Sequence, residues 1–254
     1  MPSARYPSLR DKVVLVTGGG SGIGAALVEA FVVQQANVAF VDVLIDASKA
    51  LAARLAGSGQ APLFAPCDVT DVNALEAAME EVRQRLGPVA VLINNAANDQ
   101  RQAADEVSEE DWDRTMAVNL KHQFFAAQIA RRSMRELGGG SIVNLSSAAW
   151  MTGWPRMAAY LSAKAAVVGM THALAREFGP DSIRVNAIAP GVVLTARQRR
   201  LWFSDADEAA KTVARQCLPF ALQAEDVARV ALFLAADDSR AITKQCLIVD
   251  AGAL

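Results

Sequence analysis

The sequence has 254 residues, of which 52% are hydrophobic and 20% charged, and its net charge is −2. This composition excludes a disordered chain, and because no basic block stands out it argues against nucleic acid as a partner. No apolar stretch reaches the ~20 residues of a membrane helix, and the first residues do not resemble a signal peptide, so no membrane partner is expected. Three widely spaced cysteines fit reduced thiols in a cytoplasmic protein, and two histidines without ligand spacing argue against a metal site.

Taken in chain order, short apolar runs alternate with longer helical patterns. The expected strands cover residues 13–16, 38–41, 63–65, 89–93, 141–145, 184–189 and 247–249. The expected helices cover residues 22–35, 72–86, 112–134, 160–178, 206–216 and 225–235. Strands of consecutive Val, Ile and Leu are covered on both faces, and their alternation with helices predicts a parallel sheet. The expected fold is therefore α/β: a single doubly wound, Rossmann-like parallel sheet with helices on both faces, formed by one domain over residues 1–254.

A glycine-rich turn joins the first expected strand to the first expected helix. Gly18, Gly22 and Gly24 follow a Gly-x-x-x-Gly-x-Gly spacing there. Glycine permits tight turning and close approach of the backbone to a pyrophosphate, and a helix N-terminus attracts negative charge. The turn therefore predicts a dinucleotide-binding site, in which Ser21 and Ile23 complete the expected contacts.

Polar residues at the strand ends indicate how the dinucleotide is held. Asp42 ends the second expected strand, where a carboxylate accepts hydrogen bonds from the adenosine ribose and repels a 2′-phosphate. This favours NAD over NADP, with some use of NADP left open; the alternative for Asp42 is a helix cap or turn residue. Asp68 and Val69 follow the third strand and are expected beside the adenine, although Asp68 would equally suit the cap of the next helix. Asn95 follows the fourth strand, at the edge where ligands bind in such sheets.

A tyrosine and a lysine stand four residues apart on an expected helix. Tyr160 and Lys164 therefore share one face, so the ammonium can stabilise the phenolate and lower the tyrosine's pKa from its usual value of about 10. Ser147 precedes Tyr160 by thirteen residues; its neighbour Ser146 makes a turn serine the alternative for either position. The alternative for Tyr160 is a core or interfacial tyrosine with a satisfied hydroxyl. Together with the glycine turn, the set predicts an oxidoreductase with a tyrosine acid/base.

These motifs, in this order and spacing, resemble the short-chain dehydrogenase/reductase family over residues 9–252. The matching segments are Thr17-Gly-Gly-Gly-Ser-Gly-Ile-Gly24, Asn94-Asn-Ala-Ala97, Asn119, Ser147, Tyr160-x-x-x-Lys164 and Pro190-Gly191. The resemblance implies that Tyr160 is the catalytic acid/base and that Lys164 binds the nicotinamide ribose. It also implies that Ser147 holds the reacting oxygen and that Asn119 holds a water in the proton path. The further nicotinamide contacts that it implies are Pro190, Gly191, Val193 and Thr195.

The chain departs from the family pattern at two informative positions. Ala97 replaces a usual glycine, and its methyl group is expected to narrow the space beside the nicotinamide. Lys244 stands where the family has glycine before the last strand. Because lysine is costly at positive φ, this turn is expected to be remodelled.

Three segments that follow strand ends are expected to form the substrate wall, namely residues 98–101, 150–156 and 192–203. The expected substrate contacts are Asn98, Ser147, Trp150, Trp154, Tyr160, Arg197, Gln198 and Trp202, and the wall also carries Asp99, Gln100 and Arg101. Amides and charges interleaved with tryptophan suit a polyhydroxylated molecule, because hydroxyls need polar partners and sugar C–H faces pack on aromatic rings. The alternative is that several of these side chains face solvent.

A further resemblance, to one group within this family, narrows the expected reaction. Residues 94–101, Arg197-Gln198 with Trp202, residues 216–218 and residues 250–252 resemble the bacterial aldose 1-dehydrogenases of this family, the galactose, xylose, arabinose and fucose dehydrogenase group. This implies NAD-dependent oxidation of a sugar at its anomeric carbon to a lactone, by a homotetramer. The alternatives are a 3-oxoacyl or other carbonyl reductase of the same family and, in another class, a non-catalytic NAD-binding sensor.

Overall fold

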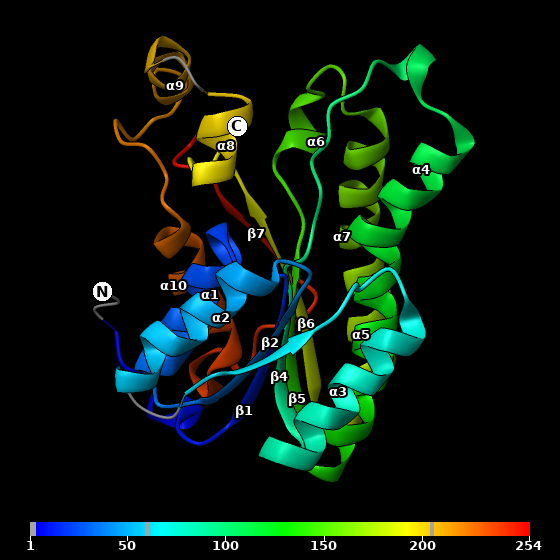
Figure 1. Cartoon of the computed structure of the whole chain (residues 1–254), viewed down its shortest axis with the longest axis vertical. Helices are drawn as coiled ribbons and strands as arrows, with labels where there is room; N and C mark the ends of the chain where they lie inside the picture. The colour runs from blue at the N-terminus through cyan, green and yellow to red at the C-terminus, as the bar shows by residue number, and fades with distance from the viewer. Residues whose placement is uncertain (1–3, 59–60, 204–205) are drawn as a thin grey trace.

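One parallel sheet organises the chain. The computed structural model describes residues 4–58, 61–203 and 206–254. Seven strands pair in the order β3-β2-β1-β4-β5-β6-β7 (Figure 1). Their bounds are β1 Val13–Thr17, β2 Asn37–Asp42, β3 Leu63–Pro66, β4 Val89–Asn94, β5 Gly140–Leu145, β6 Ile183–Pro190 and β7 Cys246–Val249. The order reverses between β1 and β4, and this switch point is where doubly wound sheets bind their ligands.

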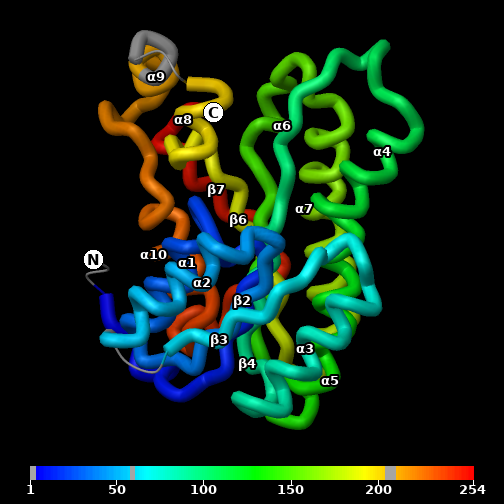
Figure 2. The backbone as a smooth tube through the Cα atoms, in the orientation of Figure 1, coloured from blue at the N-terminus to red at the C-terminus, as the bar shows by residue number. Residues whose placement is uncertain are grey.

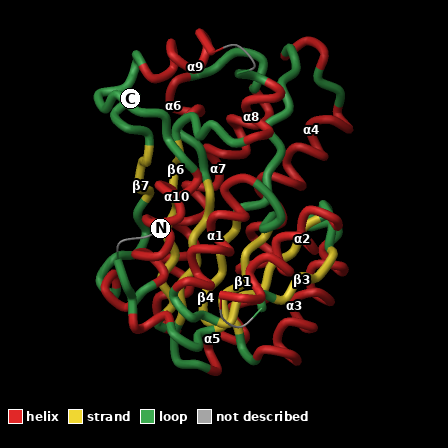
Figure 3. Tube along the Cα trace, turned by 60° about the vertical axis from the view of Figure 1, so that its left-hand side comes forward, coloured by secondary structure: helices red, strands yellow, loops and turns green. Residues whose placement is uncertain are grey.

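Helices cover both faces of the sheet. The α-helices are α1 Gly22–Val33, α2 Ile45–Leu55, α3 Val72–Leu86, α4 Glu109–Met116, α5 His122–Glu136, α6 Ala149–Thr152, α7 Ala158–Phe178, α8 Ala196–Leu201, α9 Ala206–Val213 and α10 Ala224–Ala235. Helices α1, α2 and α10 cover one face, and α3, α5 and α7 cover the other (Figures 1 and 3). Short 3-10 turns lie at Pro7–Leu9, Ala56–Ser58, Ala104–Glu106, Gly179–Asp181 and Asp237–Ser239.

Two apolar layers sandwich the sheet, because consecutive strand residues point to opposite faces. All five residues of β1 are buried, so neither face of this strand meets water. Phe31 of α1 and Phe40 of β2 are fully buried in one layer, and Met134 of α5 and Ile183 of β6 are buried in the other. The predicted doubly wound α/β fold is confirmed.

The helices differ more from prediction than the strands do. Each predicted strand is present to within one residue at either end. The segment 112–134, predicted to be largely helical, is helical throughout, with α4 and α5 joined by a π-helical turn at Ala117–Lys121. The predicted helix over residues 206–216 ends at Val213. Helices α2, α6 and α8 were not predicted, and α6 and α8 are very short.

Small elements gather beyond the C-terminal ends of the strands. Helices α6, α8 and α9 lie at that end of the molecule, beyond the sheet (Figures 1 and 2). They come from the segments that follow β5 and β6. The sheet therefore presents its ligand-binding edge to the parts of the chain predicted to form the substrate wall.

Lys244 corrects one expectation. Its φ is +66°, and its backbone N–H donates to the Val185 carbonyl at 2.8 Å. The expected remodelling of the turn is therefore wrong. The turn keeps a residue with left-handed backbone angles. Lysine adopts them because the hydrogen bond to Val185 of β6 fixes the backbone there.

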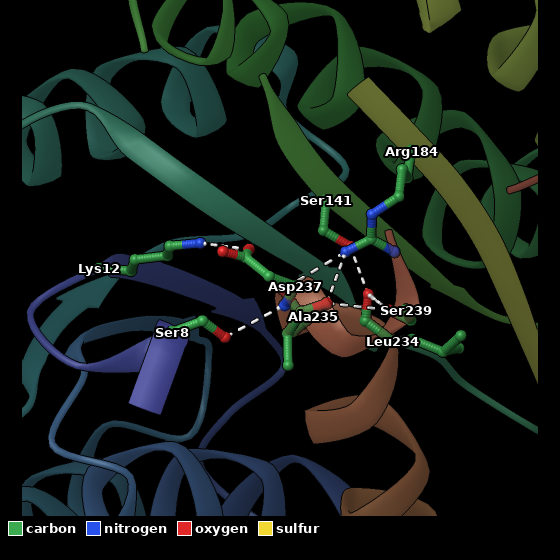
Figure 4. A network of polar contacts seen from close by, with 9 residues as sticks. Ser8, Lys12, Ser141, Arg184, Leu234, Ala235, Asp237 and Ser239 are labelled. Atoms are coloured by element: carbon green, nitrogen blue, oxygen red, sulfur yellow. Dashed lines mark hydrogen bonds and ion pairs between the residues drawn. The ribbon is translucent and has the colours of Figure 1, made fainter. Parts of the chain in front are cut away.

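Side chains from the sheet hold the C-terminal end of α10 (Figure 4). The Arg184 guanidinium donates to the carbonyls of Ala235 at 3.4 Å and Ala236 at 3.1 Å, and the Ser141 hydroxyl donates to the Leu234 carbonyl at 2.8 Å. Carbonyls in the last turn of a helix have no partner within the helix, so these side chains supply what α10 lacks. Burial lowers the pKa of Arg184, against the opposing charge of Asp237.

Arg184→Met should lower the free energy of unfolding by about 1–3 kcal/mol, because it leaves buried carbonyls without a charged donor. Urea unfolding at fixed protein concentration measures this change. The matched control, Arg240→Met, removes an exposed cation nearby and should change stability by less than about 0.5 kcal/mol. Equal effects of the two substitutions would contradict this role of Arg184.

Candidate active site

A cavity of about 1230 Å³ opens over the C-terminal ends of the strands. Residues from the predicted cofactor site and from all three predicted wall segments line it. The predicted residues that it brings together are Gly18, Ser21, Gly22, Ile23, Gly24, Asp42, Asp68, Val69, Asn95, Asn98, Ser147, Trp154, Tyr160, Lys164, Pro190, Gly191, Val193, Thr195, Arg197, Gln198 and Trp202. Asn119, Trp150 and the wall residue Gln100 do not line it.

The glycine turn has a backbone that only small residues permit. Gly18 and Gly22 have φ of +66° and +53°. A Cβ on Gly24 would lie 1.8 Å from the Gly18 carbonyl oxygen, so the helix start packs directly on the turn. Asn95 fixes this arrangement, since its side-chain amide donates to the carbonyls of Thr17 at 3.1 Å and Gly18 at 2.9 Å. Asn95 therefore shapes the turn as well as lining the cavity.

The start of α1 fits a pyrophosphate. Ser21 is its N-cap residue, and its side chain makes no capping hydrogen bond. Gly22, Ile23 and Gly24 form the first turn and line the cavity. Exposed first-turn N–H groups and the positive end of the helix dipole attract an anion. This turn can therefore hold the phosphates of a dinucleotide.

Two aspartates, at and just after the ends of β2 and β3, line the cavity. The Asp42 carboxylate accepts the backbone N–H groups of Gly20 at 2.8 Å and Leu44 at 2.9 Å, which fixes a buried negative charge beside the turn. Asp68 accepts the backbone N–H and the hydroxyl of Thr70, and Asp71 caps α3 in its place. The alternative of Asp68 as the α3 cap is therefore wrong.

The two adjacent serines have different partners. The Ser146 hydroxyl is buried and donates to the Lys164 backbone carbonyl at 2.7 Å. The Ser147 hydroxyl accepts the Ala149 N–H at 3.2 Å, and its interaction with the Tyr160 phenol lowers the pKa of that tyrosine. Ser146 therefore fastens α7 to the end of β5, and Ser147 is the serine that interacts with the tyrosine.

Lys164 is buried beneath the tyrosine. Its ammonium donates to the Leu145 carbonyl at 2.8 Å and lies 5.7 Å from the centroid of the Tyr160 ring. Burial lowers the pKa of Lys164 to about 7, although the charge of Asp99 acts in the opposite direction. Close to neutral pH this lysine can therefore hold or release a proton within the site.

The pKa of Tyr160 moves opposite to expectation. Burial raises it, the carboxylate of Asp99 raises it further, and the hydrogen bond with Ser147 lowers it. The expected lowering of the tyrosine pKa is therefore not found in the protein without ligands, because desolvation is the largest influence on it. The phenol is protonated at neutral pH in this state, which suits the acid half of an acid/base role.

Asn119 lies in the π-helical turn and is fully buried. Its side-chain oxygen accepts the Asn98 N–H at 3.0 Å, and its amide donates to the carbonyls of Asn98 and Thr115 at 3.0 Å. The side chain thus fixes the backbone of the loop that carries Asn98 into the cavity. The predicted water-holding role of Asn119 stays a prediction.

The three wall segments meet through charged and aromatic side chains. The Arg101 guanidinium carbon lies 4.2 Å from the ring centroid of Trp202 and 5.5 Å from that of Trp154. Arg197 of α8 donates to the Asn98 side chain at 3.0 Å and to the Asp99 carboxylate at 3.3 Å. The wall therefore combines indole faces with polar groups, as its sequence predicted.

Comparisons with known proteins agree with this site. A family model described as enoyl-(acyl carrier protein) reductase matches residues 18–253. The chain is 51% identical to a protein named probable galactose dehydrogenase GalD from Rhizobium meliloti (strain 1021), over 99% of this chain and 98% of that protein. It is 44% identical to the D-xylose 1-dehydrogenase of Caulobacter vibrioides (strain NA1000 / CB15N), over 99% of each chain. A solved structure of a short-chain type dehydrogenase/reductase from Mycobacterium ulcerans is 30% identical, with a TM-score of 0.91, covering 97% of this chain and 90% of that one.

The chain belongs to the short-chain dehydrogenase/reductase family. The protein is therefore an oxidoreductase that uses a nicotinamide cofactor. The glycine turn, the α1 N-terminus and the buried Asp42 fit such a dinucleotide. Within the described part of the chain, no helix is long and apolar enough to span a membrane, and no His, Cys, Asp and Glu cluster could hold a metal.

Some features of this dehydrogenase site were not predicted from sequence. Asp99 stands in a predicted wall segment, but its coupling to α8 and to the tyrosine depends on long-range packing. His122 is buried close enough to Lys164 for the two to interact. Burial, and to a smaller extent the charge of Lys164, lower the pKa of His122 to about 3, so its imidazole is neutral at pH 7. The sequence signal for His122 is its place three residues after Asn119, which by itself says nothing about burial.

Ser147→Ala should lower kcat/KM by roughly 10²–10³, because it removes a donor to the reacting oxygen. Ser146→Ala is its neighbouring control. It should lower the free energy of unfolding by about 1 kcal/mol with less than tenfold loss of activity. Steady-state kinetics and urea unfolding of both variants test this, and a larger activity loss in Ser146→Ala would contradict the assignment.

Proposed function

We propose that the protein oxidises an aldose at its anomeric carbon to the corresponding lactone, using NAD. The observation that carries this proposal is the position of the Ser147–Tyr160–Lys164 set, which opens onto a wall of polar and indole side chains. Hydroxyl-rich substrates need such paired donors and acceptors, and their C–H faces pack on indoles. The relatives named as galactose and D-xylose dehydrogenases support the same substrate class.

The residues have distinct tasks in this reaction. The Tyr160 oxygen takes the proton of the anomeric hydroxyl, while Ser147 donates a hydrogen bond to the same oxygen and holds it in place. The Lys164 ammonium supplies positive charge beside the phenolate that must form first. The oxidised nicotinamide, when bound, accepts the hydride that leaves the anomeric carbon. The carbon–oxygen double bond of the lactone forms as the proton and the hydride depart.

The preference for NAD rests on Asp42. Its carboxylate is held by two backbone N–H groups, so it cannot easily turn away from a 2′-phosphate. Asp42→Asn removes the charge and keeps an oxygen acceptor for one of these two N–H groups. The ratio of kcat/KM for NAD to that for NADP should fall about tenfold or more, equivalent to about 1.4 kcal/mol of lost discrimination. An unchanged ratio in kinetics with both cofactors would contradict this role.

The alternatives fit the site less well. A 3-oxoacyl reductase would be expected to have a more uniformly apolar wall than the one formed by Asn98, Asp99, Arg197 and Gln198. A non-catalytic sensor would have no use for the intact set of Ser147, Tyr160 and Lys164.

We also propose that the protein is a cytoplasmic homotetramer. Apolar side chains exposed on α4 and α5, and others near the C-terminus, support an assembly of copies. They are Trp112, Phe124, Leu218, Phe220, Ile248 and Leu254. The three free cysteines agree with a reducing compartment.

A panel of pentoses and hexoses, assayed with NAD and NADP by the absorbance of the reduced cofactor, tests the proposed reaction. We expect turnover of at least one aldose, with NAD preferred, and formation of its lactone. Turnover of a 3-oxoacyl thioester with no activity on any aldose would contradict the proposal.

A further inference from the structure

One carboxylate in the substrate half of the cavity has no task in the proposed proton transfer. Among the described residues, the acids that line the cavity are Asp42, Asp68, Asp99 and Asp250. Asp42 and Asp250 accept backbone N–H groups, and Asp68 accepts the groups of Thr70 in its own turn. Asp99 differs, because its hydrogen-bond partners are side chains of α8. Its side chain is 16% exposed.

The Asp99 carboxylate is held in a fixed orientation. Oδ1 accepts Nε and Nη2 of Arg197, both at 3.3 Å, and Oδ2 accepts the side-chain amide of Gln198. A carboxylate has about four acceptor positions. Three contacts, of which two are long and share one oxygen, leave Oδ2 with room for a further donor. The Asp99 carboxylate is therefore held in a fixed orientation and can still accept a further hydrogen bond.

The charge of Asp99 acts on the catalytic pair. It raises the pKa of Tyr160 and the pKa of Lys164. For Tyr160 this opposes formation of the phenolate that abstracts a proton. For Lys164 it favours the charged ammonium, so the charge of Asp99 has opposing effects on the two groups and is not explained by proton transfer alone.

The other charged and titratable groups around the pair do not remove this effect. Arg197, from α8, is paired with Asp99 and half-exposed. Arg101, from the same loop as Asp99, lies against the indoles. His122 on α5 is neutral near pH 7, because burial and Lys164 lower its pKa to about 3.

A purely structural role does not need this acid. Arg101 against Trp202 and Arg197 with Asn98 already join the loop to α8. An asparagine at position 99 would keep one oxygen, which suffices for Arg197 at Oδ1 but leaves the Gln198 amide without its Oδ2 acceptor. Holding α8 beside the loop therefore does not depend on the carboxylate alone.

We propose that Asp99 is a specificity-determining residue whose free acceptor position takes a hydrogen bond from a hydroxyl of the substrate other than the reacting one. Charge-assisted hydrogen bonds of this kind are roughly twice as strong as neutral ones. A carbonyl compound without such a hydroxyl desolvates Oδ2 and supplies no donor to its free acceptor position, so the site disfavours it. This inference rests on the proposed function and adds to it the group that selects polyhydroxylated substrates.

Asp99→Asn tests the inference, since it keeps the size of the side chain and an oxygen for α8. The assay compares the preferred aldose with its monodeoxy analogues, using the whole enzyme and NAD. We expect kcat/KM for the parent sugar to fall roughly 10- to 150-fold, the equivalent of one charge-assisted hydrogen bond. For the one analogue that lacks the recognised hydroxyl, the wild type and the variant should have nearly equal kcat/KM values. Such non-additivity identifies a direct contact.

The pH profile gives a second measurement. Removing the carboxylate lowers the pKa of Tyr160, so the rising limb of kcat/KM should move to lower pH in Asp99→Asn. The control variant Asp105→Asn removes an exposed acid and should change neither the sugar preference nor the profile.

Three outcomes overturn the inference. In the first, Asp99→Asn lowers kcat/KM equally for all sugars and analogues, the pH profile does not shift, and Arg197→Gln gives the same result. This would show that Asp99 only fastens α8. Another is no loss at all. If the wild-type enzyme oxidises no aldose, the proposed function fails together with this inference, whereas either of the first two outcomes leaves the proposed function standing.

Discussion

The burial of one ammonium group determines the arrangement of this site. Lys164 donates to the carbonyl of Leu145, the last residue of β5, and its own carbonyl accepts the hydroxyl of Ser146. These two hydrogen bonds run in opposite directions between β5 and α7. They bring the first two turns of α7 against the edge of the sheet where ligands bind. Tyr160, one turn earlier on the same helix, therefore lies above the lysine and beside Ser147.

Desolvation and charge oppose each other at this edge. Burial raises the pKa of Tyr160 and lowers the pKa of Lys164, so each group tends toward its neutral form in the protein alone. A buried pair of this kind responds strongly to any charge that enters the cavity, because few water molecules screen it. The negative charge of Asp99 always affects the two pKa values. The positive charge of an oxidised nicotinamide would affect them only while the cofactor is bound. In the proposed reaction, the positive charge of the bound cofactor would favour the phenolate.

The parts of this structure that follow from local chemistry could be predicted from the sequence. Strands such as β1 were recognised because consecutive apolar residues need cover on both faces, and the Gly18 turn because glycine alone permits its backbone. The thirteen-residue interval distinguished Ser147 from Ser146. What depends on long-range packing could not be read in the same way. The π-helical turn around Asn119, the left-handed Lys244 and the reversed pKa of Tyr160 depend on contacts with distant segments.

The central claim is that the Tyr160 oxygen carries the transferred proton. Tyr160→Phe removes that oxygen and keeps the ring that packs near Lys164. The most direct test is the single-turnover rate of cofactor reduction with saturating NAD and the preferred aldose, together with NAD binding followed by fluorescence. The account predicts a loss of roughly 10²–10⁴ in the rate, with NAD still bound. A variant that reduces the cofactor at the parental rate would contradict it.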